Sequence, residues 1–231
     1  MKAKFQGPAT VQISVAHAAI VVQLVDANGN PSDVSAPILQ SLFADKSIVK
    51  AGVGIDQDML ELYRAWDCTG DFVNRFDIGG IGAANGTTLS LKALTKAVTD
   101  VELLKSRKLA MSNWGIVPLK DTQIAYCARD AWAAAAITTE LAERDPDTFS
   151  TAALVHLLES EFCISKLNER AQGRKVAKTR MIEILGKGAD RVSKKKLTDE
   201  LQREVEELEV VLRTLAPPSS LRYDILAFGT T

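Results

Sequence analysis

Cysteine and histidine are scarce in this sequence, and their placement argues against two classes of protein. The 231 residues include three cysteines, Cys68, Cys127 and Cys163, and two histidines, His17 and His156. No two cysteines have the short spacing of a zinc ligand pair, and the histidines are far apart. An odd number of dispersed cysteines also argues against a disulfide framework. We therefore expect an intracellular protein, with nucleus and cytoplasm both open, that lacks zinc and disulfides.

Long apolar runs and an excess of charge of one sign are also missing. The longest apolar stretch, residues 11–25, is interrupted by Gln12, Ser14, His17 and Gln23, so we expect no membrane association. The formal net charge is −1, so overall charge does not make the chain a polyanion binder, although a local basic patch would. With 46% hydrophobic residues the chain is long enough for one sizeable core.

Apolar periodicity predicts an α/β domain in the first part of the chain. Residues 11–15 and 20–24 read as a β-hairpin around a turn at 16–18. A β-rich run at 47–54 ends in glycines and leads into a helical stripe at 56–66, which is typical of a strand–turn–helix unit. Further elements are a strand at 72–78, a loop at 79–86, and helices at 37–44, 89–98 and 122–143, the last capped by Asp121 or Thr122.

Composition changes after about residue 160. Residues 170–196 hold ten Lys or Arg against two acids, and residues 197–215 carry apolar residues at coiled-coil-like spacing. These segments predict a helical hairpin, either as an intramolecular pair or with residues 197–215 mediating self-association or binding a protein partner. We expect three regions: residues 1–148, a helical extension at 149–216, and an extended tail at 217–231.

Two pairs of side chains suggest chemistry. Asp56 and Asp58 follow a strand, so they are expected at the carboxyl edge of a sheet, where open α/β folds bind ligands and metals. The alternative is helix capping, with Asp56 as N-cap and Asp58 in the first turn. Tyr126 and Asp130 lie four residues apart on one helix face. They would hold a metal and position a water, or else be a core tyrosine beside a solvated carboxylate.

Taken together, these segments resemble a known family. KAGVGIDQDMLEL, from Lys50, resembles the second motif of the DEDDy 3′–5′ exonucleases, which include ribonuclease D and the Werner-type exonuclease domain. SNWGIVPLKDTQIAYCARDAWAA, from Ser112 to Ala134, resembles the stretch leading through the third, Tyr-x-x-x-Asp motif. GPATVQISV resembles the second strand, and SLKALTKAV the helix after the second motif. The similarity spans about residues 7–143.

The resemblance implies a ribonuclease H-like fold, with a mixed five-stranded sheet flanked by helices. It also implies a nuclease that hydrolyses phosphodiester bonds from 3′ ends with two Mg²⁺ or Mn²⁺ ions. By position, Asp58 is the second-motif carboxylate, Asp130 the third-motif metal ligand and Tyr126 the residue that orients water. DNA and RNA are both open as substrates.

The first motif of the family, Asp-x-Glu on the first strand, has no counterpart here. MKAKFQGPATVQIS contains no acid, and Asp58 and Asp130 are a thin shell for two hard cations. The tail DILAFGTT, residues 224–231, resembles that strand with Gly229 and Thr231 at the acid positions. We expect either a circular permutation that restores the strand, a tail without this function, or an incomplete gene with the motif upstream. A catalytically inactive pseudo-exonuclease that binds nucleic acid or a protein is the alternative function.

The basic stretch in the helical extension also has two interpretations. It is a solvated helix face, or it contacts phosphates beside the exonuclease cleft and gives salt-dependent binding. The residues expected to bind nucleic acid in the second case are Arg174, Lys175, Lys178 and Arg180.

Overall fold

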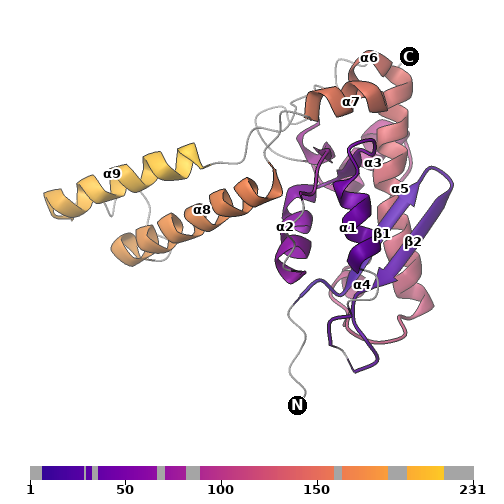
Figure 1. The fold of residues 1–231 in the computed structure, drawn as a ribbon, viewed down its shortest axis with the longest axis horizontal. Coiled ribbons are helices and arrows are strands. Elements are labelled where there is room, and N and C mark those ends of the chain that lie inside the picture. Colours follow the sequence, from indigo (N-terminus) through magenta and orange to yellow (C-terminus); the bar gives the residue numbers. More distant parts are fainter. Residues whose placement is uncertain are drawn as a thin grey trace. The chain divides into compact units, whose positions relative to one another are not determined.

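A computed structural model of the chain describes residues 7–28, 30–32, 36–66, 71–81, 89–158, 163–186 and 197–215. The described residues fall into two compact units, the first ending at residue 158 and the second running from 163 to 215 (Figure 1). The tail at 217–231, including the strand expected at 224–231, lies outside the described residues. None of the described helices is both long and apolar enough to cross a membrane.

The predicted β-hairpin is present at the start of the first unit. Strands β1 (Thr10–Val15) and β2 (Ala18–Gln23) pair antiparallel, with Ile13 opposite Ile20. Alternation of apolar and polar residues places Val11 in the core and leaves Gln12 exposed. The hairpin packs against a long helix, α5 (Asp121–Arg144), which carries the third motif (Figure 1).

The predicted strand–turn–helix unit is also present. Helix α1 (Ala36–Ala44) precedes strand β3 (Lys50–Gly52), which leads directly into α2 (Ile55–Ala65). Strand β4 (Arg75–Asp77) pairs with β3 in parallel, with Gly52 opposite Asp77, and runs into a 3₁₀ turn, η1 (Ile78–Gly80). Because paired parallel strands end at one edge, residues that follow β3 and β4 lie on the same side of this sheet.

The core of the first unit lies where β4 and η1 meet α3 (Leu91–Thr99) and the second half of α5. Phe76 and Phe149 pack with ring centroids 6.1 Å apart, and Ile137 and Leu94 are fully buried beside them. Burial of these large side chains is the main stabilising term for the unit. It fixes α5 against the β3–β4 sheet.

The mixed α/β class is confirmed, with both antiparallel and parallel pairing present. The described residues form two separate two-stranded sheets, β1–β2 and β3–β4, so a single five-stranded sheet is not seen among them. Both sheets contact α5. The hairpin does so through β1 and β2, and the second sheet does so through β3. One helix therefore places the two sheets within the same unit.

Several details differ from the sequence-based prediction. The N-cap of α2 is Gly54 rather than Asp56, which was the alternative interpretation, and that of α5 is Lys120 rather than Asp121 or Thr122. Part of the predicted loop at 79–86 is the turn η1, and residues 82–86 lie outside the described residues. Two short helices were not predicted, α4 (Arg107–Ala110) and α6 (Pro146–Phe149), because four residues are too few for an apolar period to be visible in sequence. Helix α7 (Thr151–Leu158) lies in the range where a helical extension was expected.

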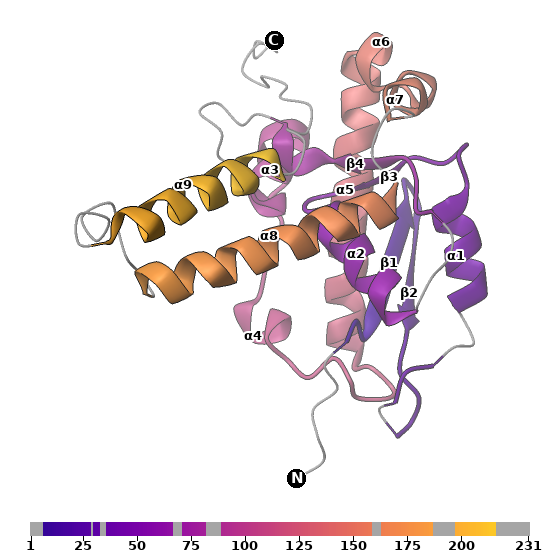
Figure 2. The ribbon, with the colours of Figure 1, turned by 60° about the vertical axis from the view of Figure 1, so that its left-hand side comes forward.

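The second unit consists of α8 (Ile164–Leu185) and α9 (Asp199–Thr214), which contact each other and lie side by side (Figure 2). Val205 of α9 is fully buried. Arg180 of α8 donates two hydrogen bonds to the Glu204 carboxylate of α9, at 2.7 and 3.1 Å. This fork-shaped ion pair fixes the register of the two helices.

A buried lysine at the start of β3 makes stability depend on pH. Lys50 is 8% exposed, and its Nζ donates to the Asp45 carbonyl at 2.7 Å. Desolvation lowers the pKa of Lys50 to about 8. The negative charge of Asp45 opposes this shift, and the positive charge of Arg75 adds to it. Between pH 8 and 10.5 the unfolded chain binds more protons at this site than the folded chain, so the free energy of unfolding rises with pH.

Lys50→Met removes this titration. We expect the unfolding free energy of the wild type, relative to that of the variant, to increase by about 2 kcal/mol between pH 7.5 and 9.5. Urea unfolding of both proteins at the two pH values measures the difference, in which the other titrating groups cancel. Parallel pH profiles for the two proteins would contradict the burial of a charged Lys50.

Candidate metal and nucleic-acid site

The first candidate carboxylates lie in the turn between β3 and α2. Gly54 has a φ of 71°, a left-handed conformation that favours glycine and lets the chain start a helix immediately after the strand. Asp56 and Asp58 consequently lie in the first turn of α2, where the helix dipole stabilises negatively charged side chains. Asp56 accepts a hydrogen bond from Nε of buried Arg75 at 2.7 Å. Asp56 is therefore a structural partner of β4 and not a free ligand.

Asp77, at the end of β4, stabilises this turn through hydrogen bonds to its backbone. Its Oδ1 accepts from the backbone N–H groups of Gly54 at 3.0 Å and Gly79 at 2.8 Å. Asp77 ends β4 and Asp58 lies in the first turn after β3, so the two acids share the carboxyl edge of the parallel β3–β4 sheet. Asp77 is not among the residues predicted from the sequence, where its signal is an acid at the end of a strand, two residues before Gly79-Gly80.

The environment of Asp58 disfavours its ionised form. Loss of solvent around the carboxylate raises the pKa of Asp58 to about 6, with repulsion from Glu61 and then Asp77 adding to it. The residue nevertheless keeps an exposed surface, so a ligand has access to it. A cation placed there would relieve the repulsion among the three acids.

The second candidate pair lies on α5. Burial raises the pKa of Tyr126, and the nearby carboxylate of Asp130 adds to the shift. The Asp130 side chain is only 16% exposed, and its Oδ2 accepts from Nζ of Lys105 at 3.1 Å. The Trp114 ring lies against Tyr126 with centroids 5.9 Å apart. Tyr126 and Asp130 thus lie together on α5, with the Trp114 ring packed against the tyrosine.

Two glutamines fix the segment before α5. Gln123 is 2% exposed, donates to the Ser112 hydroxyl at 3.0 Å and the Asn113 carbonyl at 3.1 Å, and accepts from the Lys120 backbone at 3.1 Å. Gln23 of β2 bonds the same segment at the Ile116 carbonyl and the Leu119 N–H. These contacts hold the Trp114 segment against the helix.

Asp58 and Asp130 interact with two separate sets of side chains among the described residues. The charges that shift Asp58 are Glu61 and Asp77, whereas Asp130 interacts with Tyr126 and Lys105. Within the part of the chain that the structure describes, no three His, Cys, Asp or Glu side chains lie close enough together to hold a metal ion. Carboxylate oxygens suit Mg²⁺ or Mn²⁺ in kind, but the described residues supply few of the ligands that two such ions need.

The basic residues predicted to bind nucleic acid lie on α8. Lys175 and Lys178 are exposed, and Arg174 is half-buried. Arg180 is engaged by Glu183 at 3.3 Å as well as by Glu204. It is therefore already paired with two carboxylates, and its use for a phosphate would require their displacement.

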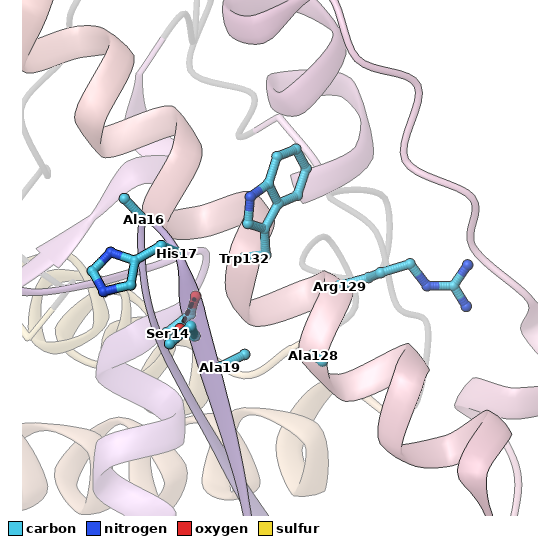
Figure 3. A pocket seen from close by; sticks show the side chains of 8 residues that line it. Ser14, Ala16, His17, Ala19, Ala128, Arg129 and Trp132 are labelled. Atoms are coloured by element: carbon cyan, nitrogen blue, oxygen red, sulfur yellow. Dashed lines mark hydrogen bonds between the residues drawn. The ribbon is translucent and has the colours of Figure 1, made fainter.

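A shallow hollow lies elsewhere on the first unit, between the hairpin turn and α5. His17 and Ser14 come from the hairpin, while Trp132 and Arg129 come from α5, with the Arg129 guanidinium pointing away from the hairpin (Figure 3). Arg129 Nε donates to the Ala125 carbonyl of its own helix at 3.1 Å. The hollow contains none of the predicted site residues.

Comparison with known proteins points to one family. The chain is 38% identical over 104 residues to a mouse bifunctional 3′–5′ exonuclease/ATP-dependent helicase, covering 45% of this chain and 7% of that protein. It is 32% identical over 126 residues to an Arabidopsis thaliana 3′–5′ exonuclease, covering 54% of this chain and 42% of that protein. A mouse exonuclease 3′–5′ domain-containing protein 2 matches at 32% identity over 108 residues, or 45% of this chain and 16% of that protein.

The chain thus spans less than half the length of each of these relatives. A family model described as 3′–5′ exonuclease matches residues 6–144, which is more than half of the chain and includes β1, α2 and all of α5. The matched range contains Asp58, Tyr126 and Asp130, and it ends where α5 ends. On this match the chain belongs to the 3′–5′ exonuclease family.

Proposed function

We propose that this chain hydrolyses phosphodiester bonds of nucleic acid from the 3′ end, with Asp58 and Asp130 as ligands of Mg²⁺ or Mn²⁺. The family generally uses divalent metal ions. The observation that carries the proposal is the Tyr126–Asp130 pair, a phenol and a largely buried carboxylate one turn apart on α5 within the range that the family model matches. Bound cations would activate water and stabilise the charge of the leaving oxygen.

The residues of this chain have separate tasks in that reaction. The Tyr126 hydroxyl is a neutral donor, since its raised pKa keeps the proton on the phenol, and it would orient the attacking water. The Trp114 ring beside it offers an apolar face against which a terminal base would stack. Asp77 would keep the turn that carries Asp58 in place, and Gln123 would hold the Trp114 segment against α5, which supplies the geometry that positioning requires.

The proposal extends to parts of the fold that the described residues leave open. A five-stranded sheet would need another strand between the β1–β2 and β3–β4 sheets, for which residues 224–231 are our candidate. The exonuclease domain would then comprise residues 1–148 and the tail, with residues 149–216 as the helical extension. Arg174, Lys175, Lys178 and Arg180 of the extension would contact phosphates, in an intracellular protein that acts on DNA or RNA.

The test is trimming of a 5′-labelled single-stranded oligonucleotide by the full chain in Mn²⁺. We expect a ladder of products shortened from the 3′ end, and none when an inverted terminal nucleotide blocks that end. An intact oligonucleotide in both cases would contradict hydrolysis. Comparison of DNA and RNA of one sequence identifies the preferred sugar.

A second function is favoured by two observations. Lys105 already neutralises Asp130, and few metal ligands surround Asp58 in the described part of the chain. A nucleic-acid-binding or protein-binding module without hydrolysis would keep the aromatic wall and the basic helix but lose the cation. Salt-dependent binding of the oligonucleotide without trimming would identify this function.

A further inference from the structure

The ion pair between Lys105 and Asp130 links two segments that are distant in sequence. The Lys105 ammonium lies 3.1 Å from Asp130 Oδ2, across 25 residues of chain. The lysine side chain is 32% exposed and the aspartate side chain 16%. Neighbouring Leu103 is buried at 3% exposure and anchors the segment that presents the lysine.

Oδ2 of the Asp130 carboxylate is therefore occupied by the Lys105 ammonium. An ammonium and a divalent cation seek the same oxygen lone pairs, and their like charges repel each other within a few ångströms. Both cannot occupy Asp130 Oδ2 together.

We propose that Lys105 competes with the divalent cation for Asp130, so that metal binding displaces the ammonium and frees it to pair with a phosphate of the nucleic acid. The inference rests on the proposed function, because it takes Asp130 as a metal ligand. Lysine suits such an exchange, since its charge sits at the end of a flexible four-carbon stem and keeps a strong hydration shell when released.

The exchange couples the two ligands of the site. Without metal, Lys105 is held by Asp130 and contributes little to phosphate binding. With metal, the released ammonium adds one phosphate contact, so each ligand raises the affinity for the other by the same factor. Arg107 and Lys108 on the adjoining helix α4 carry further positive charge near this lysine in sequence, which favours a phosphate over another cation as its second partner.

The test compares Lys105→Met with Lys108→Met, an equal charge change at an exposed lysine three residues away. Mn²⁺ binding to the full chain is measured by electron paramagnetic resonance. We expect Lys105→Met to tighten Mn²⁺ binding by about tenfold, as removal of a close positive charge requires, and Lys108→Met to change it by less than about twofold. Lys105→Gln should reproduce the effect if the variant with methionine is poorly folded.

The second readout is fluorescence anisotropy of a single-stranded DNA oligonucleotide with a blocked 3′ end. Mn²⁺ should raise the affinity of the wild type several-fold, and this increase should be reduced in Lys105→Met. Unchanged Mn²⁺ affinity in both variants at position 105 would overturn the inference. Tighter Mn²⁺ binding by Lys105→Met in a chain that never trims DNA would support the competition while contradicting the proposed hydrolysis.

Discussion

Replacing Asp130 by Asn is expected to lower the rate of Mn²⁺-dependent trimming by at least about 10²-fold, the scale on which loss of a transition-state electrostatic contact acts. The substitution preserves the size of the side chain and leaves an oxygen for the Tyr126 hydroxyl. It removes the negative charge that would hold a cation and that now pairs with Lys105. The chemical step should therefore be lost while the helix is kept.

The control for this prediction is Asp121→Asn, at an exposed aspartate in the first turn of the same helix. Trimming is followed as the loss of full-length 5′-labelled oligonucleotide, and folding as the urea midpoint of each variant. We expect Asp121→Asn to retain the wild-type rate. If Asp130→Asn trims as fast as the wild type, Asp130 is not a metal ligand.

Asp77→Ala is expected to lower the free energy of unfolding by about 3 kcal/mol. The reason is that one oxygen, Oδ1, accepts two backbone hydrogen bonds, from Gly54 and Gly79. A hydrogen bond to a charged group contributes about 1.5–3 kcal/mol, and alanine leaves both donors without that acceptor. The β3–α2 turn should loosen, and Asp58 with it.

Asp77→Asn is the matched variant, since its side-chain carbonyl can occupy the position of Oδ1. It should keep both hydrogen bonds in uncharged form and lose only about 1 kcal/mol. Urea unfolding gives both values, and Mn²⁺ titration shows whether Asp58 keeps its position. Equal stability of the alanine variant and the wild type would mean that Asp77 does not fasten the turn.

The elements with a clear period were predictable, and the caps were not. Alternation at residues 11–15 and the stripe at 56–66 identify the hairpin and α2 because burial on one face imposes the period. The N-cap assignment of Asp56 is wrong because the left-handed Gly54 begins the helix earlier and Arg75, 19 residues away, takes the carboxylate. Local propensity carries no information about such a partner.

In the candidate site, too, residues related by local spacing were predictable, and residues that meet only through the fold were not. The spacing of Tyr126 and Asp130 is visible in sequence because residues four apart lie on one helix face, and the structure has both on α5. Lys105 and Asp77 escape detection, since each meets its partner only through the fold. Both were missed although they set the charge and the position of the predicted ligands.

A double-mutant cycle on Mn²⁺ affinity tests most directly whether Asp58 and Asp130 bind one cation. Wild type, Asp58→Asn, Asp130→Asn and the double variant are titrated by electron paramagnetic resonance. We expect each single substitution to weaken binding by at least about tenfold, and the double variant to lose much less than the two effects added together. An unchanged Mn²⁺ affinity in either single variant, or two losses that simply add, would place the carboxylates in separate sites.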